Sequence, residues 1–463
     1  MSFADTALTN VKFVPFWIDD ASLEASEPVL AADIQTDLLI VGGGFTGLWT
    51  SILAKEENPD RDVVLIEANH IGHGASGRPG AIVSTSVMHG LSNAIRVFPN
   101  DLEELERLGH ENMDGFMSAI ERYKIDCDFE FGGELTVGIG SETDELLDEE
   151  FEINREHGHE VERLDEAGTK AQVNSPIFTG AVWSKKRSGT VHPGKLVHGL
   201  KKAALSLGVQ IHENTPLVSA DDLAGKVSVT TDSGSILANK VLLATNAFAA
   251  GHKRIKSRVA LVRDRLLATE PLTAAQMKSI GWANRQGIYD TRTQMNYMRL
   301  TKDNRIIFGG RLGYFFAGDP DPAEDKTEMP YIRLAEAFHR TFPQLADVKI
   351  SHAWSGPIGL TNRMAVHFQH YFGGKMIYAG GYSGFGVSAS RFGARVGLAI
   401  ADDKQLPELQ LEFAKSEPGW IPPEPFRWFG AKVTLYAMDT MDEKGGWRQP
   451  WIRFVEKLGF PLT

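Results

Sequence analysis

The sequence predicts a mixed fold of the α/β and α+β classes, in which a parallel-strand unit and a mostly antiparallel sheet occur in one chain. A short apolar run at residues 37–41 ends at three glycines, a helical pattern covers residues 46–57, and a second apolar run covers residues 63–66. Strand, glycine turn, helix and strand in this order are typical of a βαβ unit. An antiparallel sheet is indicated by alternating apolar and polar residues at 259–269, 294–300 and 305–309.

The remaining elements are placed by the same patterns. Acidic, helix-patterned stretches at 101–123 and 141–173 flank a strand at 133–139, and their charge runs are typical of solvated helix faces. Further elements are predicted as a helix at 194–207, strands at 210–212, 226–231, 241–244 and 376–379, and a helix at 388–402. Residues 1–35 predict an irregular arm, and residues 404–463, rich in Pro and Trp, predict an appended extension without a core of its own.

Composition excludes several classes of protein. With 42 % hydrophobic and 23 % charged residues, wholesale disorder is excluded. The net charge of −12 disfavours a general surface for nucleic acid or anionic membranes. The single cysteine, Cys127, excludes an intramolecular disulfide and a multi-cysteine metal site, and it favours a cytoplasmic location. No apolar run reaches about 18 residues, so no membrane span is expected. His352, His367 and His370 lack acidic partners at metal-ligand spacing, so no metal site is expected.

The first glycine turn carries a dinucleotide-binding motif. Gly42, Gly44 and Gly47 follow the order G-x-G-x-x-G between a strand and a helix, where the backbone approaches a pyrophosphate closely. Glu67, 25 positions after Gly42, closes the second strand, near the spacing of about 20 expected for an acid that binds ribose hydroxyls. An acid at this place favours FAD or NAD over a phosphorylated ribose.

Six motifs in a fixed order resemble the FAD-dependent D-amino-acid oxidase superfamily. They are VGGGFTG at 41–47, GHGASGR at 72–78, ATNAF at 244–248, ATEPL at 268–272, RIIFGGR at 305–311 and YAGGYSGFG at 378–386. Within the superfamily the chain is most similar to the gamma-glutamylputrescine and aminophosphonate oxidoreductase branch, over about residues 12–403.

The resemblance implies a Rossmann-like FAD-binding domain, of the glutathione-reductase-like type, interleaved with a mostly antiparallel substrate domain. The FAD-binding domain is expected to comprise residues 36–95, 166–255 and 351–403. The substrate domain is expected to comprise residues 96–165 and 256–350, between the arm at 1–35 and the extension at 404–463.

The resemblance also implies the residues that hold FAD. It places Gly42, Gly44 and Gly47, with Phe45 and Thr46 at the start of the helix, at the pyrophosphate, and Glu67 at the ribose. It places Ala75, Ser76 and Arg78 along the flavin and the backbone of Val218 at the adenine. The pyrimidine end of the flavin is expected over Gly381, Tyr382, Ser383, Gly384, Phe385 and Gly386, with the following helix dipole directed at it.

The chain departs from the family pattern at positions that bear on attachment and substrate. Pro79 replaces an asparagine, Phe385 a histidine, and Ser388 a lysine that binds a carboxylate in some relatives. Arg78 stands where some relatives attach FAD through a histidine, so non-covalent FAD is expected.

The implied reaction is oxidation of an amine by hydride transfer to flavin N5, followed by hydrolysis of the imine. Arg299, Arg363 and Arg78 are candidates for binding an anionic group of the substrate, although a structural role for Arg299 or Arg363 stays equally open. Tyr297 is a candidate for closing the pocket, or a core residue. His192 reads as the turn before a helix, because Pro193 follows it. Oxygen or another acceptor takes the electrons.

Two other functions remain open at this stage. An NAD-dependent dehydrogenase would use the same first glycine turn, but it has no need of a second glycine-lined chain return at 380–390. A non-enzymatic flavin-binding scaffold would keep the nucleotide for stability alone.

Overall fold

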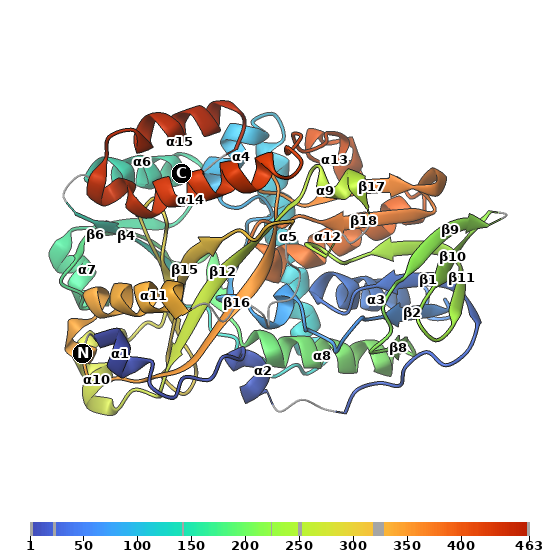
Figure 1. The fold of residues 1–463 in the computed structure, drawn as a ribbon, viewed down its shortest axis with the longest axis horizontal. Coiled ribbons are helices and arrows are strands. Elements are labelled where there is room, and N and C mark those ends of the chain that lie inside the picture. The colour runs from blue at the N-terminus through green and yellow to red at the C-terminus, as the bar shows by residue number, and fades with distance from the viewer. Residues whose placement is uncertain are drawn as a thin grey trace.

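Two eight-stranded sheets, side by side, organise the molecule (Figure 1). The computed structural model describes residues 3–21, 25–140, 143–223, 225–248, 252–317 and 328–460. The first two residues of the stretch predicted as helical at 141–173 lie outside this set.

The first sheet contains the predicted βαβ unit. Its strand order is β17-β18-β11-β1-β2-β8, with the hairpin of β9 and β10 paired to β11. The strands are β1 (Ile34–Val41), β2 (Val63–Ile66), β8 (Gln210–His212), β9 (Ser219–Leu223), β10 (Lys226–Thr230), β11 (Ser235–Leu243), β17 (His367–Tyr371) and β18 (Met376–Gly380). β1, β2, β8, β11 and β18 run parallel. Their carboxyl ends therefore meet at one edge, which brings together chain segments about 340 residues apart.

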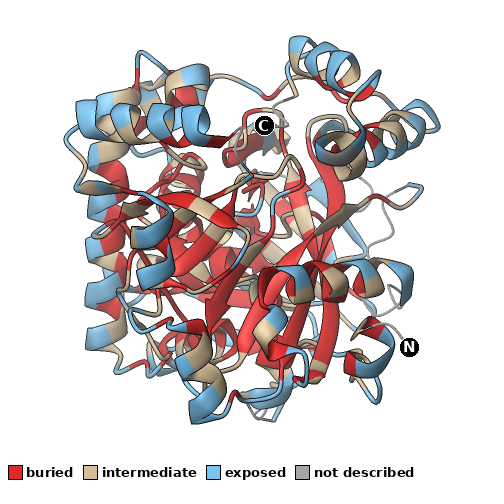
Figure 2. Ribbon diagram, turned by 90° about the vertical axis from the view of Figure 1, so that its left-hand side faces the viewer, coloured by how far each residue is buried: buried red, intermediate tan, exposed pale blue. Residues whose placement is uncertain are grey.

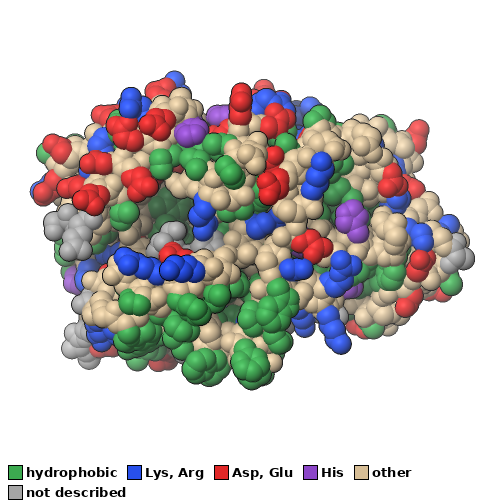
Figure 3. Space-filling model, turned by 90° about the horizontal axis from the view of Figure 1, so that it is seen from above, with side chains coloured by type: hydrophobic (Ala, Val, Ile, Leu, Met, Phe, Trp, Pro, Cys, Tyr) green, Lys and Arg blue, Asp and Glu red, His purple; other side chains and the backbone are tan. Residues whose placement is uncertain are grey.

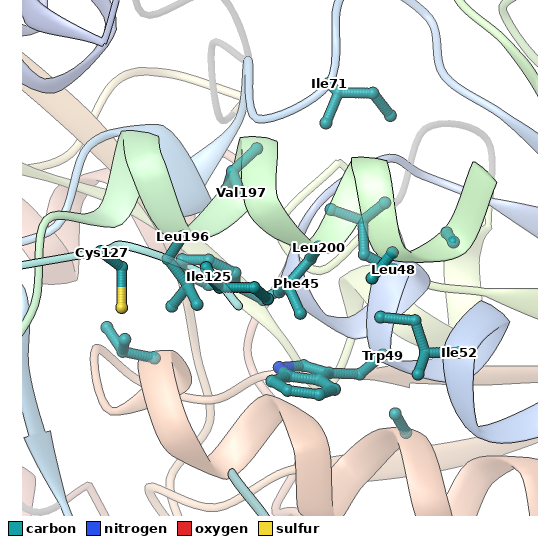
Figure 4. Close-up of a cluster of buried hydrophobic side chains, with 14 of the residues drawn as sticks. Phe45, Leu48, Trp49, Ile52, Ile71, Ile125, Cys127, Leu196, Val197 and Leu200 are labelled. Atoms are coloured by element: carbon teal, nitrogen blue, oxygen red, sulfur yellow. The ribbon is translucent and has the colours of Figure 1, made fainter. Parts of the chain in front are cut away.

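Three helices pack against this sheet and against one another. They are α3 (Phe45–Glu57), α8 (Pro193–Ser206) and α12 (Gly386–Ala401). Figure 4 shows Trp49 of α3 directed toward α12, and Leu48 with Leu196, Val197 and Leu200 of α8 in the same apolar cluster. At the start of α8, His192 Nδ1 accepts a hydrogen bond from the amide of Lys195 at 3.1 Å. This confirms His192 as the residue that begins the helix.

The second sheet has the order β16-β12-β15-β14-β13-β4-β6-β5, with all pairs antiparallel except β13 with β4. Its strands are β4 (Glu134–Ile139), β5 (Val161–Leu164), β6 (Phe178–Ser184), β12 (Ala260–Thr269), β13 (Gly287–Asp290), β14 (Tyr297–Leu300), β15 (Ile306–Gly313) and β16 (Ile350–Leu360). One face packs on α11 (Glu328–Thr341) through buried side chains that include Leu267, Met298 and Phe308. The opposite face carries Tyr297 and Leu266, which pack with the core of the first sheet.

The second sheet uses more of the chain than the predicted substrate segments do. β6 lies beyond the boundary predicted at residue 165, and β16 beyond the one predicted at residue 350. The stretch predicted as helical at 141–173 is divided by β5 into α6 (Asp144–Glu156) and α7 (Glu166–Gln172). β5 is only four residues long and two of them are charged, so its alternation is hidden within an acidic sequence.

The outer layers come from the remaining segments. The helices are α1 (Phe3–Ala7), α2 (Phe16–Asp20), α4 (Leu91–Val97), α5 (Leu102–Arg122), α9 (Lys253–Lys256), α10 (Ala274–Ile280), α13 (Glu412–Lys415), α14 (Phe426–Lys444) and α15 (Arg448–Lys457), and the short strands β3 (Ile82–Ser84) and β7 (Ser188–Thr190) pair with each other. Figure 2 shows buried residues concentrated in the sheets and exposed residues on the outer helices. In the extension, Ala437, Met438 and Ile452 form only a small cluster.

Candidate functional site

The first glycine turn, between β1 and α3, is built so closely that only glycine fits. Gly42 has φ of +114°, and a Cβ atom there would lie 2.8 Å from the carbonyl oxygen of Ala244. A Cβ atom at Gly47 would lie 1.9 Å from the carbonyl oxygen of Gly42. The turn and the start of α3 therefore depend on these glycines, as the motif predicts.

The amino terminus of α3 is available to an anion. Gly44 is the N-cap residue and offers no side chain to the first-turn amides. The flavin loop, residues 72–81, approaches this turn, because the amide of Phe45 donates to Ser76 Oγ at 2.9 Å. A Cβ atom at Gly44 would lie 2.9 Å from the same oxygen. The first-turn amides that follow Phe45 and the helix dipole at this position fit a pyrophosphate.

Glu67 lies beside the same turn, at the end of β2. Its Oε2 accepts a hydrogen bond from the amide of Gly43 at 2.7 Å, and its Oε1 accepts one from the amide of Asn69 at 3.0 Å. Burial raises the pKa of the Glu67 carboxyl although these bonds oppose the change. The carboxyl group is thus held at the glycine turn, where a ribose-binding acid is required.

The second glycine turn, after β18, meets the first. Thr46 Oγ1 donates to Tyr382 Oη at 2.9 Å, which joins the start of α3 to residues 336 positions later. Gly381 has φ of +84°, and a Cβ atom there would lie 2.6 Å from the side chain of Thr361. The two glycine-lined turns therefore belong to one site.

Asn246, in the ATNAF motif, supports the second turn from β11. Its Oδ1 accepts a hydrogen bond from the amide of Gly381 at 2.8 Å, and its carbonyl oxygen accepts one from Tyr378 Oη at 2.7 Å. Asn246 is not among the predicted cofactor-binding residues, although its motif is one of the six that carry the family resemblance. An asparagine just after a buried strand, where it adopts φ of +44°, is the signal that identifies it.

The second turn leads directly into α12. Phe385 is the N-cap residue and provides no side-chain cap, and Gly384 and Gly386 flank it. The ring of Phe385 lies 4.1 Å from that of His89, whose pKa burial lowers to about 4, so this imidazole is neutral at pH 7. Ser383 Oγ accepts a hydrogen bond from the amide of Thr361 at 3.1 Å, which fixes the turn. The free amides of α12 fit a group that acquires negative charge.

Val218 precedes the β9–β10 hairpin. Its amide donates to the carbonyl oxygen of Thr230 at 2.9 Å, and its side chain is 60 % exposed. Contact of its backbone with an adenine stays a prediction.

Tyr297 lies on the face of the second sheet that meets the flavin loop. Glycines flank its ring, because a Cβ atom at Gly80 would lie 2.2 Å from the ring and one at Gly309 would lie 2.1 Å from it. Tyr297 Oη donates to Asp264 Oδ2 at 2.5 Å. The sequence analysis did not single out Asp264, which occurs in an alternating strand pattern with no motif of its own.

The three candidate arginines bind backbone carbonyl groups. Arg299, 1 % exposed, donates to the carbonyl oxygens of Ala81, Val191 and Leu300.

Arg363 donates to the carbonyl oxygens of Val366, Phe413 and Ser416. Arg78 donates to the carbonyl oxygens of His73 and Ser355 and so ties the flavin loop to β16. These contacts favour a structural role for Arg299 and Arg363, although binding of substrate by either stays a prediction.

The model for the family described as "DAO: FAD dependent oxidoreductase" matches residues 37–397. The chain belongs to this family of FAD-dependent oxidoreductases. The match covers both sheets and both glycine turns, so the protein is an enzyme with FAD as its cofactor, acting on amines or amino-acid-like substrates. FAD as the cofactor also explains the second glycine turn, which an NAD-dependent dehydrogenase would not need.

Curated relatives and solved structures agree with this DAO-family assignment. The chain is 30 % identical over 388 residues to gamma-glutamylputrescine oxidoreductase of Escherichia coli, covering 82 % of this chain and 87 % of the relative. It is 29 % identical over 400 residues to the probable oxidoreductase OrdL of Haemophilus influenzae, covering 84 % and 89 %. Glycine oxidase from Geobacillus kaustophilus has the same fold, with a TM-score of 0.69 and 17 % identity over 81 % of this chain and 96 % of that one.

The residues of this DAO-family enzyme fit FAD at the edge of the first sheet. The uncapped start of α3 and Glu67 suit the phosphates and ribose, and the uncapped start of α12 suits the flavin. Among the described residues, no three His, Cys, Asp or Glu side chains gather as a metal site requires. In the described part of the chain, no helix has the length and apolar character needed to cross a membrane. Figure 3 shows acidic and basic side chains interspersed on the upper face, without a continuous basic surface.

Glu67→Ala is expected to weaken FAD binding about 100-fold, because the carboxylate that accepts hydrogen bonds from the ribose hydroxyls is lost. A hydrogen bond to a charged acceptor contributes about 1.5–3 kcal/mol. Titration of the apoprotein with FAD, followed by flavin fluorescence, measures the change. Glu57→Ala is the control and is expected to leave the FAD affinity unchanged, because Glu57 lies at the carboxyl-terminal end of α3 in a surface ion pair with Lys404. Equal affinities of the two variants would contradict the assignment of Glu67.

Proposed function

We propose that this DAO-family enzyme oxidises an amine substrate through non-covalently bound FAD and releases an imine that hydrolyses in water. The observation that carries the proposal is the Thr46–Tyr382 hydrogen bond of 2.9 Å, which joins the two glycine turns into one site next to the second sheet. When bound there, FAD accepts a hydride from the carbon beside the substrate nitrogen. The side chains of the protein need only bind and orient the substrate and exclude water.

The substrate class is proposed from the relatives and from the charges of the site. The Escherichia coli relative is named for gamma-glutamylputrescine, a polyamine derivative with a free amino group. The flavin-facing wall carries Asp264 and Tyr297, whereas Arg299 and Arg363 donate to carbonyl groups. The ammonium group of either substrate could meet the Asp264 carboxylate, but an aminophosphonate would add the negative charge of its phosphonate beside that carboxylate. A polyamine derivative therefore suits this wall better.

Attachment and location follow from the residues present. Arg78 donates to two backbone carbonyls beside the flavin loop, and Cys127 is buried with its pKa raised to about 12, so neither offers a nucleophile for a covalent bond to FAD. A single cysteine is also typical of a reducing compartment, and we place the enzyme in the cytoplasm.

Anaerobic bleaching of the purified yellow protein tests the proposal. The panel consists of gamma-glutamylputrescine, N-methylglycine, glycine and 2-aminoethylphosphonate, and we expect gamma-glutamylputrescine to bleach the flavin fastest. Readmission of air with a peroxide assay then distinguishes oxygen from another electron acceptor. Fastest bleaching by 2-aminoethylphosphonate would replace the cationic substrate class by the anionic one. A yellow protein that none of these amines bleaches would contradict amine oxidation and favour a flavin-binding scaffold.

A further inference from the structure

The proposed function uses only the negative charge of Asp264, a buried carboxylate that faces the flavin loop. Asp264 stands opposite Gly356 where β12 pairs with β16, and residues directly opposite one another share a face of the sheet. A Cβ atom at Gly356 would lie 3.2 Å from the Cβ atom of Arg78 in the flavin loop. The hydrogen bond from Tyr297, whose ring packs on Gly80 of the same loop, independently places Asp264 on this face.

This face of the second sheet is less completely covered than the other. Tyr297 and Tyr289 are half-buried, whereas their neighbours Met298 and Ile288, which face α11, are 0 % exposed. The alternation places Tyr297, Tyr289 and Asp264 on the face that is directed toward the first sheet. A substrate that lies between the flavin loop and the second sheet would contact this face.

The Asp264 carboxylate is held in one orientation. Tyr297 Oη donates to its Oδ2, and the amide of Arg265 donates to its Oδ1 at 2.9 Å. The glycines on both sides of the Tyr297 ring leave that ring one position. An acceptor fixed in this way loses little conformational entropy when it binds a ligand.

The surrounding charges leave Asp264 without an ion pair among the described residues. On its own strand, Arg263 and Arg265 alternate toward the other face. The charge of Arg265 nevertheless lowers the pKa of Asp264, against the effect of burial. The other titratable groups nearby are Tyr297 and Arg299 on β14, Tyr289 on β13, Arg311 on β15 and Arg78 in the flavin loop. Arg311 pairs with Asp439 of the extension, and Arg78 binds the carbonyl oxygens of His73 and Ser355. A buried carboxylate that forms no ion pair within the protein binds a cation favourably.

We propose that Asp264, oriented by Tyr297, binds the protonated amine of the substrate and takes up its proton before oxidation. The inference rests on the proposed function and narrows its substrate class to ammonium ions that carry an N–H bond, which excludes quaternary ammonium ions. An N–H bond of the ammonium group breaks, the proton passes to a carboxylate oxygen of Asp264, and the electron pair stays on nitrogen as the lone pair. Only an amine with this lone pair can form the carbon–nitrogen double bond of the imine.

The first test is the pH dependence of stability of Asp264→Asn, which removes the charge and keeps the shape. Burial raises the pKa of Asp264 from 3.8 to about 6. The folded protein thus binds this proton more tightly than the unfolded chain, and stability falls as pH rises through that window. We expect Asp264→Asn to melt at a higher temperature than the wild type at pH 7.5 and at the same temperature at pH 4. A lower melting temperature at pH 7.5 would show a structural role and overturn the inference.

The second test is anaerobic flavin bleaching by the amine of the panel that reduces the wild type fastest. For Asp264→Asn we expect a loss of about 10²–10³-fold in the limiting rate at pH 7, typical of a lost proton acceptor. The loss should shrink toward pH 10, where the free amine is abundant. For Tyr297→Phe we expect a loss of about tenfold, because the carboxylate is retained but less well oriented.

Glu150→Gln is the matched control. Glu150 accepts a hydrogen bond from Thr136 Oγ1 at 2.8 Å, and burial of its carboxyl group raises its pKa to about 7. It thus resembles Asp264 in its raised pKa and its hydroxyl donor, but it is half-buried and lies on α6. We expect its limiting bleaching rate and pH profile to match the wild type. Wild-type rates and pH profile for Asp264→Asn would overturn the inference while the proposed function stands. A wild type that no amine bleaches would instead overturn the proposed function itself.

Discussion

Gly42→Ala is expected to yield a protein that retains no FAD and melts well below the wild type. The new Cβ atom would lie 2.8 Å from the carbonyl oxygen of Ala244, a backbone atom of the residue that follows β11. The φ of +114° adds a conformational penalty of about 1–2 kcal/mol for any residue with a side chain. β1 and β11 would therefore separate at the edge where the pyrophosphate binds. The visible absorbance of flavin per mole of purified protein, together with the melting temperature, measures both effects.

Gly430→Ala is the matched control for this substitution. Gly430 lies within α14, and a Cβ atom there would meet nothing within 4 Å. Replacing an unconstrained helical glycine by alanine stabilises a helix by up to about 1 kcal/mol. We therefore expect full flavin content and an unchanged or slightly higher melting temperature. Full flavin content in Gly42→Ala would contradict the placement of FAD at this turn.

The sequence could predict the first glycine turn because every requirement for it is local. The apolar run of β1, the three glycines and the helical pattern of α3 lie within 24 residues, and Glu67 follows soon after. Steric and hydrogen-bonding rules for strand, turn and helix act over such distances. The second turn required the family resemblance, because its link to the first, the Thr46–Tyr382 bond, joins residues 336 positions apart.

The wall of the substrate site could not be predicted in the same way. In the run VRDRLL, Arg263, Asp264 and Arg265 are all charged, and an alternating pattern does not tell which face meets the flavin loop. Arg299, Arg363 and Arg78 are predicted as anion ligands because the guanidinium group suits carboxylates and phosphonates. Their partners are backbone carbonyls brought close by the tertiary fold, and no residue type in the sequence marks a carbonyl as an acceptor.

Arg299→Met is expected to destabilise the folded protein by about 3 kcal/mol without altering the flavin content of the molecules that fold. Arg299 is 1 % exposed and donates to the carbonyl oxygens of Ala81, Val191 and Leu300, which methionine would leave without this donor. Each buried polar group without a partner costs about 1–3 kcal/mol, partly offset because burial of the charge is no longer required. That burial lowers the pKa of Arg299 to about 9. Urea unfolding followed by tryptophan fluorescence measures the change.

The position of Arg299 explains why the effect is structural. Its guanidinium joins β14 to the segments that precede β3 and α8, and it lies 5.4 Å from the ring of Trp17 in the amino-terminal arm. Arg107→Met, which breaks exposed ion pairs with Glu104 and Glu111 on α5, is the control, with an expected change within about 0.5 kcal/mol. A substrate ligand would behave in the opposite way, because Arg299→Met would then unfold like the wild type and raise KM for the amine. For Arg299 to bind substrate, the second sheet would need to expose its guanidinium group. The carbonyl oxygens of Ala81 and Val191 would then need other donors.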